Sequence, residues 1–172
     1  SAPDRGEPAQ LGLEGARVVD ERRGPALERL RRAVTAPLVR HPDSGEEGIL
    51  AGYHWFNEWG RDTMIALPGV ALATGDWERV RQVLEAWSGR VSLGMLPNRL
   101  GDRAEVRLYN SAAAPLWFIR AIEALHRTAP EESSMRRHFL PAMREILRYY
   151  VQGTRYGIRV EEDGLLTACA TG

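Results

Sequence analysis

Residues 53–62, with the sequence YHWFNEWGRD, combine the residue types that bind sugars. Four aromatic residues fall within seven positions of this stretch, and Arg61 and Asp62 follow them. An aromatic face stacks on the apolar C–H face of a pyranose, while carboxylate and guanidinium groups form bidentate hydrogen bonds with its hydroxyls. The stretch therefore predicts a sugar site. The alternative is that the tryptophans are core residues and that Arg61 and Asp62 form a structural ion pair at a helix start.

Three blocks of sequence together resemble the C-terminal glucosidase domain of glycogen debranching enzymes, the amylo-α-1,6-glucosidase family. The blocks are AGYHWFNEWGRDTMIALPGVALATG, GMLPNRL and YNSAAAPLWFIRAIEAL, in the family's order and at similar separations. The resemblance covers residues 45–168. It implies an all-α fold, an (α/α)6 toroid of the six-hairpin glycosidase type, of which this chain would form about the N-terminal half.

The resemblance also implies a reaction, the hydrolysis of α-1,6-glucosyl branch stubs of glycogen or another branched α-glucan. In the inverting mechanism one carboxyl group protonates the leaving oxygen and a second activates water, so no cofactor is implied. In the family the acid follows a GLL-x-AG motif and the base lies far downstream. We therefore expect both catalytic carboxylates beyond Gly172, an inactive isolated chain, and the remaining half of the same domain as its partner.

Individual residues gain expected roles from the same resemblance. Arg61 and Asp62 would hold the glucose at the cleavage point, and the other blocks would supply the walls and rim of the pocket. The substrate-binding candidates are Tyr53, Trp59, Arg61, Asp62, Asn98, Arg99, Tyr109 and Asn110. Structural alternatives remain, because Tyr53 and Trp59 would also suit a core and Asn110 would also suit a helix cap.

The chain departs from the family pattern at three places. His54 replaces a proline, Ala113 stands where the family has an aspartate on an inner helix, and the tail TACATG differs from AGEPG. Ala113 removes a carboxylate that would hydrogen-bond to a sugar. Ala113 and the altered tail favour the alternative hypothesis, a non-catalytic helical carbohydrate-binding or degenerate domain of the same family. An unrelated helical solenoid for protein partners is disfavoured by the WGRD block lying between helices.

Composition narrows the class of protein. The chain has 172 residues, enough for one domain with a real core, and its 23 basic and 23 acidic residues balance, which gives no reason to expect a nucleic acid or a membrane as partner. Cys169 is the only cysteine, which excludes an intrachain disulfide and a cysteine-based zinc site. The histidines have no metal-like spacing, so we expect no metal. No apolar window approaches a membrane span and no leader pattern is present, so we expect a cytoplasmic protein.

The elements that must position the site are mainly helices. We expect residues 1–24 to be an extended segment and residues 25–172 to form the partial glucosidase domain. Apolar residues recur every three or four positions in residues 25–42, 76–89, 111–125 and 131–152, which predicts four helices. Asp76 is a good N-cap, Gly89 suits a C-terminus, and Pro141 can split or bend the last helix. The predicted inward residues are Leu27, Leu30, Val34, Leu38, Trp77, Val80, Leu84, Trp87, Leu116, Ile119, Ile122, Leu125, Phe139, Met143, Ile146, Leu147 and Tyr150.

Two further stretches lack helical periodicity. Residues 90–110 are rich in Gly, Pro, Asn and Arg and predict a long loop of the kind that is more often functional than filler. Residues 158–166 around EEDG predict a short hairpin. Trp117 and Phe118 are adjacent, so a helix cannot turn both of them inward.

Overall fold

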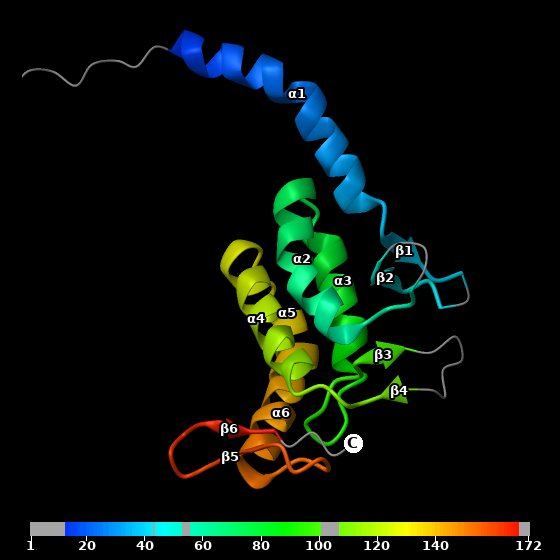
Figure 1. Ribbon diagram of the computed structural model, residues 1–172, viewed down its shortest axis with the longest axis vertical. Helices are drawn as coiled ribbons and strands as arrows, with labels where there is room; N and C mark the ends of the chain where they lie inside the picture. Colours follow the sequence, from blue (N-terminus) through cyan, green and yellow to red (C-terminus); the bar gives the residue numbers. More distant parts are fainter. Residues whose placement is uncertain (1–12, 43, 53–55, 101–106, 169–172) are drawn as a thin grey trace, which may run out of the picture.

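The computed structural model describes residues 13–42, 44–52, 56–100 and 107–168 and shows a mainly helical chain (Figure 1). This agrees with the expected all-α class. The helices are α1 (Leu13–Thr35), α2 (Gly60–Thr74), α3 (Trp77–Ser88), α4 (Ala113–Thr128), α5 (Glu132–Ser134), the π-helical turn η1 (Met135–Phe139) and α6 (Leu140–Gln152). The strands are β1 (Leu38–Arg40), β2 (Glu47–Ile49), β3 (Arg99–Leu100), β4 (Arg107–Leu108), β5 (Arg159–Val160) and β6 (Leu166–Thr167), paired in that order as three antiparallel hairpins.

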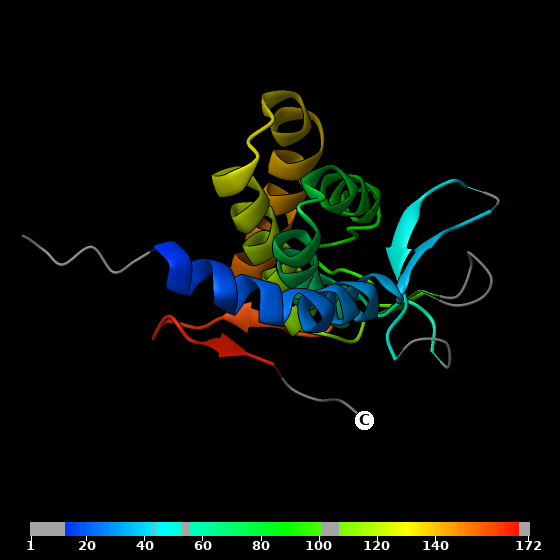
Figure 2. The same cartoon turned by 90° about the horizontal axis from the view of Figure 1, so that it is seen from above.

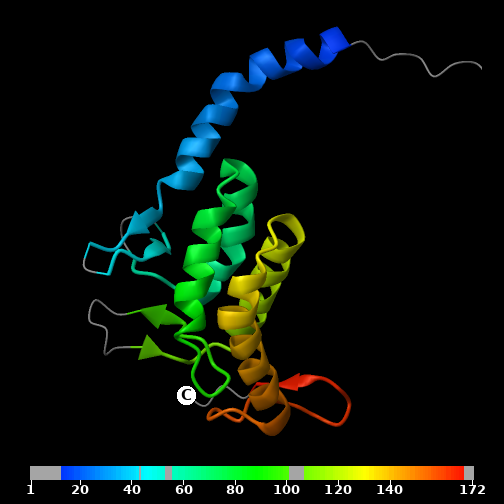
Figure 3. The same cartoon turned by 180° about the vertical axis from the view of Figure 1, so that it is seen from behind.

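The core lies between α2, α3, α4 and the η1–α6 segment (Figure 3). Helices α2 and α4 lie side by side over most of their length, and α3 packs against both of them. The large side chains that they bury completely are Trp87, Phe118, Met64, Leu67 and Ile122. At about 25 cal/mol for each Å² of apolar surface removed from water, these contacts are the main source of stability for the part of the molecule that carries the site.

Helix α1 begins earlier than expected. The sequence predicted a start at Pro25 after an extended segment, but the helix begins at Leu13, so residues 13–24 are helical and that part of the expectation is wrong. Residues 1–12 lie outside the described residues. Pro25 sits inside α1, where it removes one backbone hydrogen bond, and the helix curves along its length (Figure 1).

The predicted apolar face of α1 is also only partly correct. Val34 and Leu38 pack against the core, but Leu30 is 62% exposed and Leu27 is exposed as well. The helix ends at Thr35 rather than at Pro42, so Leu38 lies in β1. Seen from above, α1 crosses the end of α2 and extends past the other helices (Figure 2), which agrees with the exposure of Leu27 and Leu30.

Helix α3 follows its sequence pattern closely. The Arg79 N–H donates to Asp76 Oδ1 over 3.0 Å, so Asp76 is the N-cap, as predicted. Val80, Leu84 and Trp87 are buried, while Trp77 is half-buried against the core.

Helix α4 forms where it was expected, and three of its predicted inward residues, Ile119, Ile122 and Leu125, do face the core. The Ala114 N–H donates to Ser111 Oγ over 3.2 Å, so Ser111 caps the helix. Phe118 is fully buried, while its neighbour Trp117 is 42% exposed. Leu116, predicted to point inward, is exposed. The run of apolar residues from Leu116 to Ile119 is continuous, so periodicity alone does not select one face.

The predicted helix over residues 131–152 consists of three pieces. Helix α5 passes into the π-helical turn η1 and then into α6, with Pro141 in the first turn of α6. Proline has no N–H to donate to the residue four positions earlier, which agrees with the expected break. Phe139, Ile146 and Tyr150 are buried, but Leu147 is exposed, against expectation. The predicted hairpin is present as β5 and β6.

Glu131 caps α5 and gives a testable pH effect. Its carboxylate accepts hydrogen bonds from the side chains and backbone N–H groups of Ser133 and Ser134, led by the Ser133 hydroxyl, and these lower its pKa from 4.5 to about 2. A lowered pKa means that the stabilisation is complete above about pH 4.5 and is lost as the pH falls towards 2.

We expect Glu131→Gln to be less stable than the parent chain at pH 6, with the difference closing as the pH falls from 4.5 to 2. Urea denaturation at several pH values measures it. Glu132→Gln, which removes an exposed ion pair with Arg136, is the control and should show a small, nearly pH-independent effect. A Glu131→Gln deficit that stays constant down to pH 2 would contradict the assignment.

Candidate functional site

Main-chain pairing brings the three sequence blocks together. The Gly60 N–H donates to the Asn98 carbonyl oxygen and the Leu100 N–H donates to the Glu58 carbonyl oxygen, both over 3.0 Å. The Asn98 N–H in turn donates to the Leu108 carbonyl oxygen over 2.6 Å, next to the β3–β4 pair. Residues 58–60, 98–100 and 107–108 therefore lie side by side, and we call them the site ribbon. Figure 1 shows β3 and β4 beside the start of α2.

Gly60 permits the close approach of two segments of this ribbon. A Cβ at this position would overlap the Pro97 carbonyl oxygen and would lie 3.0 Å from Cζ3 of Trp87. A side chain of any size would force the start of α2 away from β3. The glycine of the WGRD block is thus required by packing.

Arg61 and Asp62 lie in the first turn of α2, directly after the site ribbon. Their side chains are 51% and 47% exposed, and Arg61 Nε lies 4.0 Å from Asp62 Oδ2. An exposed pair at this distance contributes little to stability. Asp62 is favoured at the N-terminus of a helix by the helix dipole. Both groups therefore have hydrogen-bonding capacity to offer a ligand.

Asn98, Arg99 and Asn110 lie on the neighbouring segments of the ribbon. Asn98 Nδ2 donates to Asn110 Oδ1 over 3.3 Å, while Asn98 Oδ1 is buried without a hydrogen-bond partner among the described residues. Arg99 is exposed and forms an isolated antiparallel bridge with Trp59. Ser111, not Asn110, caps α4, so the capping alternative does not account for Asn110.

The aromatic candidates differ in their surroundings. Tyr109 is half-buried, its hydroxyl donates to the Arg90 carbonyl oxygen over 3.2 Å, and the Arg155 guanidinium lies 4.7 Å from its ring centroid. The Tyr109 hydroxyl is therefore already hydrogen-bonded within the protein, and this contact ties the residue after β4 to Arg90. Trp59 is partly exposed and remains available to a ligand. Tyr53 lies outside the described residues.

A buried carboxylate lies in the segment that leads into Arg61 and Asp62. Glu58 is 4% exposed, and its carboxylate is hydrogen-bonded to His41 Nε2. Burial raises the pKa of Glu58 above its ordinary value, against the lowering effects of His41 and Arg90. Nothing in the sequence pairs Glu58 with His41, because seventeen positions separate them.

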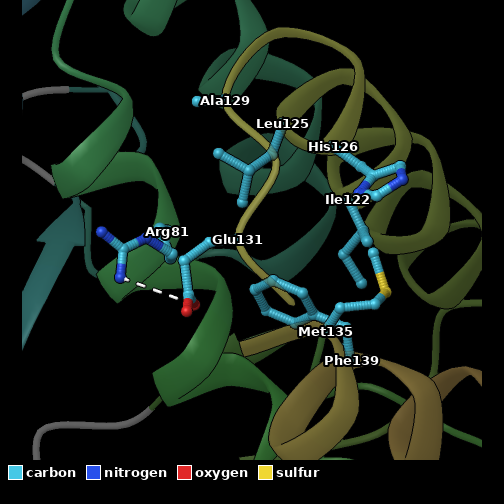
Figure 4. A pocket seen from close by; sticks show the side chains of 8 residues that line it. All are labelled: Arg81, Ile122, Leu125, His126, Ala129, Glu131, Met135 and Phe139. Atoms are coloured by element: carbon cyan, nitrogen blue, oxygen red, sulfur yellow. Dashed lines mark ion pairs between the residues drawn. The ribbon is translucent and has the colours of Figure 1, made fainter. Parts of the chain in front are cut away.

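A small pocket between α3, α4 and the α5–η1 segment lies elsewhere (Figure 4). Arg81 and Glu131 face each other across it, 3.9 Å apart. Its other lining residues are Ile122, Leu125, His126, Ala129, Met135 and Phe139. A free volume of about 10 Å³ is room for roughly one water molecule, so this pocket does not hold a sugar.

The described residues contain no group of three or more His, Cys, Asp or Glu side chains placed to hold a metal ion. Among the helices of these residues, none has both the length and the apolarity to cross a membrane.

Comparison with known proteins points to one family. The family model described as amylo-alpha-1,6-glucosidase matches residues 32–171. The glycogen debranching enzyme of Saccharomyces cerevisiae is 32% identical over 65 residues, which are 38% of this chain and 4% of the yeast protein. The chain therefore spans a small part of that relative. No solved structure matches.

Proposed function

Because this chain belongs to the amylo-α-1,6-glucosidase family, we propose that it is part of a glycoside hydrolase that removes α-1,6-linked glucosyl stubs from glycogen-like α-glucans. The family match and the similarity to a glycogen debranching enzyme support a glycosidase of the debranching type. The proposal goes further in assigning the linkage, the inverting mechanism and a role for the described residues.

The role that the geometry supports best is binding of a terminal glucose. The observation that carries it is the grouping of exposed hydrogen-bonding side chains along one ribbon. Arg61 supplies planar N–H donors, Asp62 supplies acceptors, and the exposed Asn110 side chain accepts from Asn98 Nδ2. A pyranose presents several hydroxyls that both donate and accept, and it needs partners of both kinds.

The same residues do not supply both catalytic groups. An inverting glycosidase needs two carboxyl groups roughly 6.5–9.5 Å apart, one on each side of the scissile bond. Of the carboxylates on the segment 58–62, Asp62 is exposed, while Glu58 is buried against His41. We therefore assign substrate binding to these residues, and proton transfer to carboxylates elsewhere in the enzyme.

The proposed (α/α)6 toroid requires further helices next to the described ones. Apolar side chains are exposed on α2 and on α4, at Ile65, Leu72, Leu116 and Trp117. Helices that turn such residues towards water normally pack against something else in the complete protein. The exposed residues support the proposal that this chain forms about half of the domain.

One observation favours the second candidate, a carbohydrate-binding domain without catalysis. Ala113 begins α4 beside Asn110, and the first turn of α4 carries no acidic residue. A family member that lacks this carboxylate would keep Arg61 and Asp62 but bind sugar more weakly. Hydrolysis of an α-1,6-linked substrate by a longer form of the protein separates the two candidates.

Titration calorimetry of the chain with isomaltose tests the binding role. We expect weak but measurable binding that both Arg61→Ala and Asp62→Ala reduce by at least tenfold, since a hydrogen bond to a charged group contributes about 1.5–3 kcal/mol. Arg120→Ala removes an exposed arginine from α4 and should leave the affinity unchanged.

Circular dichroism must first show that each variant is helical. A folded parent chain that does not bind isomaltose, or variants that bind it as well as the parent chain does, would overturn the proposed site.

A further inference from the structure

The carboxylate of Glu58 is buried directly under the segment that leads into Arg61 and Asp62. Its backbone carbonyl oxygen accepts the N–H of Leu100, which joins this segment to β3. Its side chain is hydrogen-bonded to Nε2 of His41, the residue that follows β1. One residue therefore connects the site ribbon to the β1–β2 hairpin.

The hairpin is shaped around that carboxylate. A Cβ on Gly48 in β2 would overlap the carboxyl group of Glu58, so any other residue at this position would displace that carboxylate. The hairpin is held in turn by α3 and by the second residue after it, through Glu47 with Arg79 Nε over 3.2 Å and Glu46 with Arg90. Arg90 also lies 5.5 Å from the ring centroid of the buried Trp87. The contacts run without a break from the core to Glu58.

We propose that Glu58 is a positioning residue for the sugar site, which acts by anchoring residues 58–60 to the β1–β2 hairpin through His41. The inference rests on the proposed function, because it concerns the same site. When the anchor is in place, the ribbon fixes the direction in which the first turn of α2 presents Arg61 and Asp62. When it is released, those side chains remain exposed but lose their common geometry, and small displacements at a binding site cost large factors in affinity.

The anchor has a pH dependence of defined sign. The ionisable groups that face the Glu58 carboxylate are His41, Arg90 and Glu46. Burial raises the pKa of Glu58, so it takes up a proton at a higher pH than an exposed glutamate does. Protonation removes the charge from the hydrogen bond with His41, and sugar affinity therefore falls on acidification.

Glu58→Gln tests the inference, because glutamine keeps the size of the side chain and cannot ionise. We expect it to weaken isomaltose binding by about tenfold at pH 7 and to abolish the loss of affinity on acidification that the parent chain shows. Glu85→Gln is the matched control, a part-buried glutamate that accepts from Ser134 Oγ, and it should leave both values unchanged. Glu58→Ala should show the larger loss of affinity if it folds.

Amide hydrogen exchange tests the anchor without any sugar being present. The N–H groups of Gly60 and Leu100, which pair residues 58–60 with β3, should exchange at least tenfold faster in Glu58→Gln than in the parent chain at the same pH. The amides of α6 should not change. A parent chain that fails to bind isomaltose would overturn the proposed function, while faster exchange at these two amides would still support the anchor. Unchanged exchange at both amides, or an affinity and a pH profile equal to those of the parent chain, would overturn the inference.

Discussion

Phe118→Ala should lower the free energy of unfolding by about 4 kcal/mol, whereas Trp117→Ala should change it by less than about 1 kcal/mol. Phe118 is 0% exposed in the contact between α4 and its neighbours, while Trp117 is 42% exposed on the same helix. Truncating a buried aromatic side chain removes its transfer free energy and leaves a cavity. Truncating the larger tryptophan costs less, because 42% of its surface already faces solvent and no closed cavity is left behind.

Urea denaturation followed by circular dichroism measures both values. The pair is informative because the two positions are adjacent and share the backbone, cap and helix propensity of α4. The free energy of unfolding of a domain of this size is about 5–15 kcal/mol. The Phe118→Ala chain should therefore still fold at low temperature, unless the parent chain lies at the lower end of this range. If Trp117→Ala proved the more damaging change, α4 would have to be turned by about one residue from its position here.

Gly60→Ala should cost about 3 kcal/mol and also reduce isomaltose binding, while Gly69→Ala in the same helix should gain about 0.5–1 kcal/mol. A Cβ at Gly60 meets the backbone of Pro97, which cannot move aside as a flexible side chain could. It would also lengthen the hydrogen bond from the Gly60 N–H to the Asn98 carbonyl oxygen. Gly69 has nothing within 4 Å of the added atom, so alanine there brings only its better helix propensity.

The same denaturation experiment, together with isomaltose titration, checks this prediction. Gly69→Ala controls for the general effect of alanine in α2, and the two values should differ by about 4 kcal/mol. A Gly60→Ala chain with the stability and affinity of the parent would show that the start of α2 does not need to approach β3 so closely.

The helices were predictable where a cap and an unbroken period agreed. Asp76 and the spacing of Val80, Leu84 and Trp87 identified α3 and its inward face. In α4 the residues from Leu116 to Ile119 are all apolar, so the spacing fits either of two helix faces. Packing against the neighbouring helices decides between them and buries Phe118. In α1 the apolar spacing predicted one inward face, but only Val34 of that face packs against the core within the helix, while Leu27 and Leu30 are exposed.

The sequence supplied the residues of the proposed site, but it did not predict which backbone segments would lie side by side there. Aromatic and charged types marked the segment that leads to Arg61 and Asp62, and the family resemblance added Asn98 and Arg99. Their proximity depends on backbone hydrogen bonds between 58–60 and 98–100, for which residue types carry no signal. The anchor at Glu58 depends on a histidine that is remote in sequence and on the missing side chain of Gly48.

The pairing of residues 58–60 with 98–100 also determines when the site can form during folding. The chain between them is α2, α3 and the loop that follows, and closing it as a disordered loop would cost entropy before any contact is made. Helices form locally and early, and the packing of α2 against α3 brings the two ends of the segment near each other. The proposed sugar site therefore requires α2 and α3 to be packed together, and we expect it to be absent from a partly folded state in which that pair has separated.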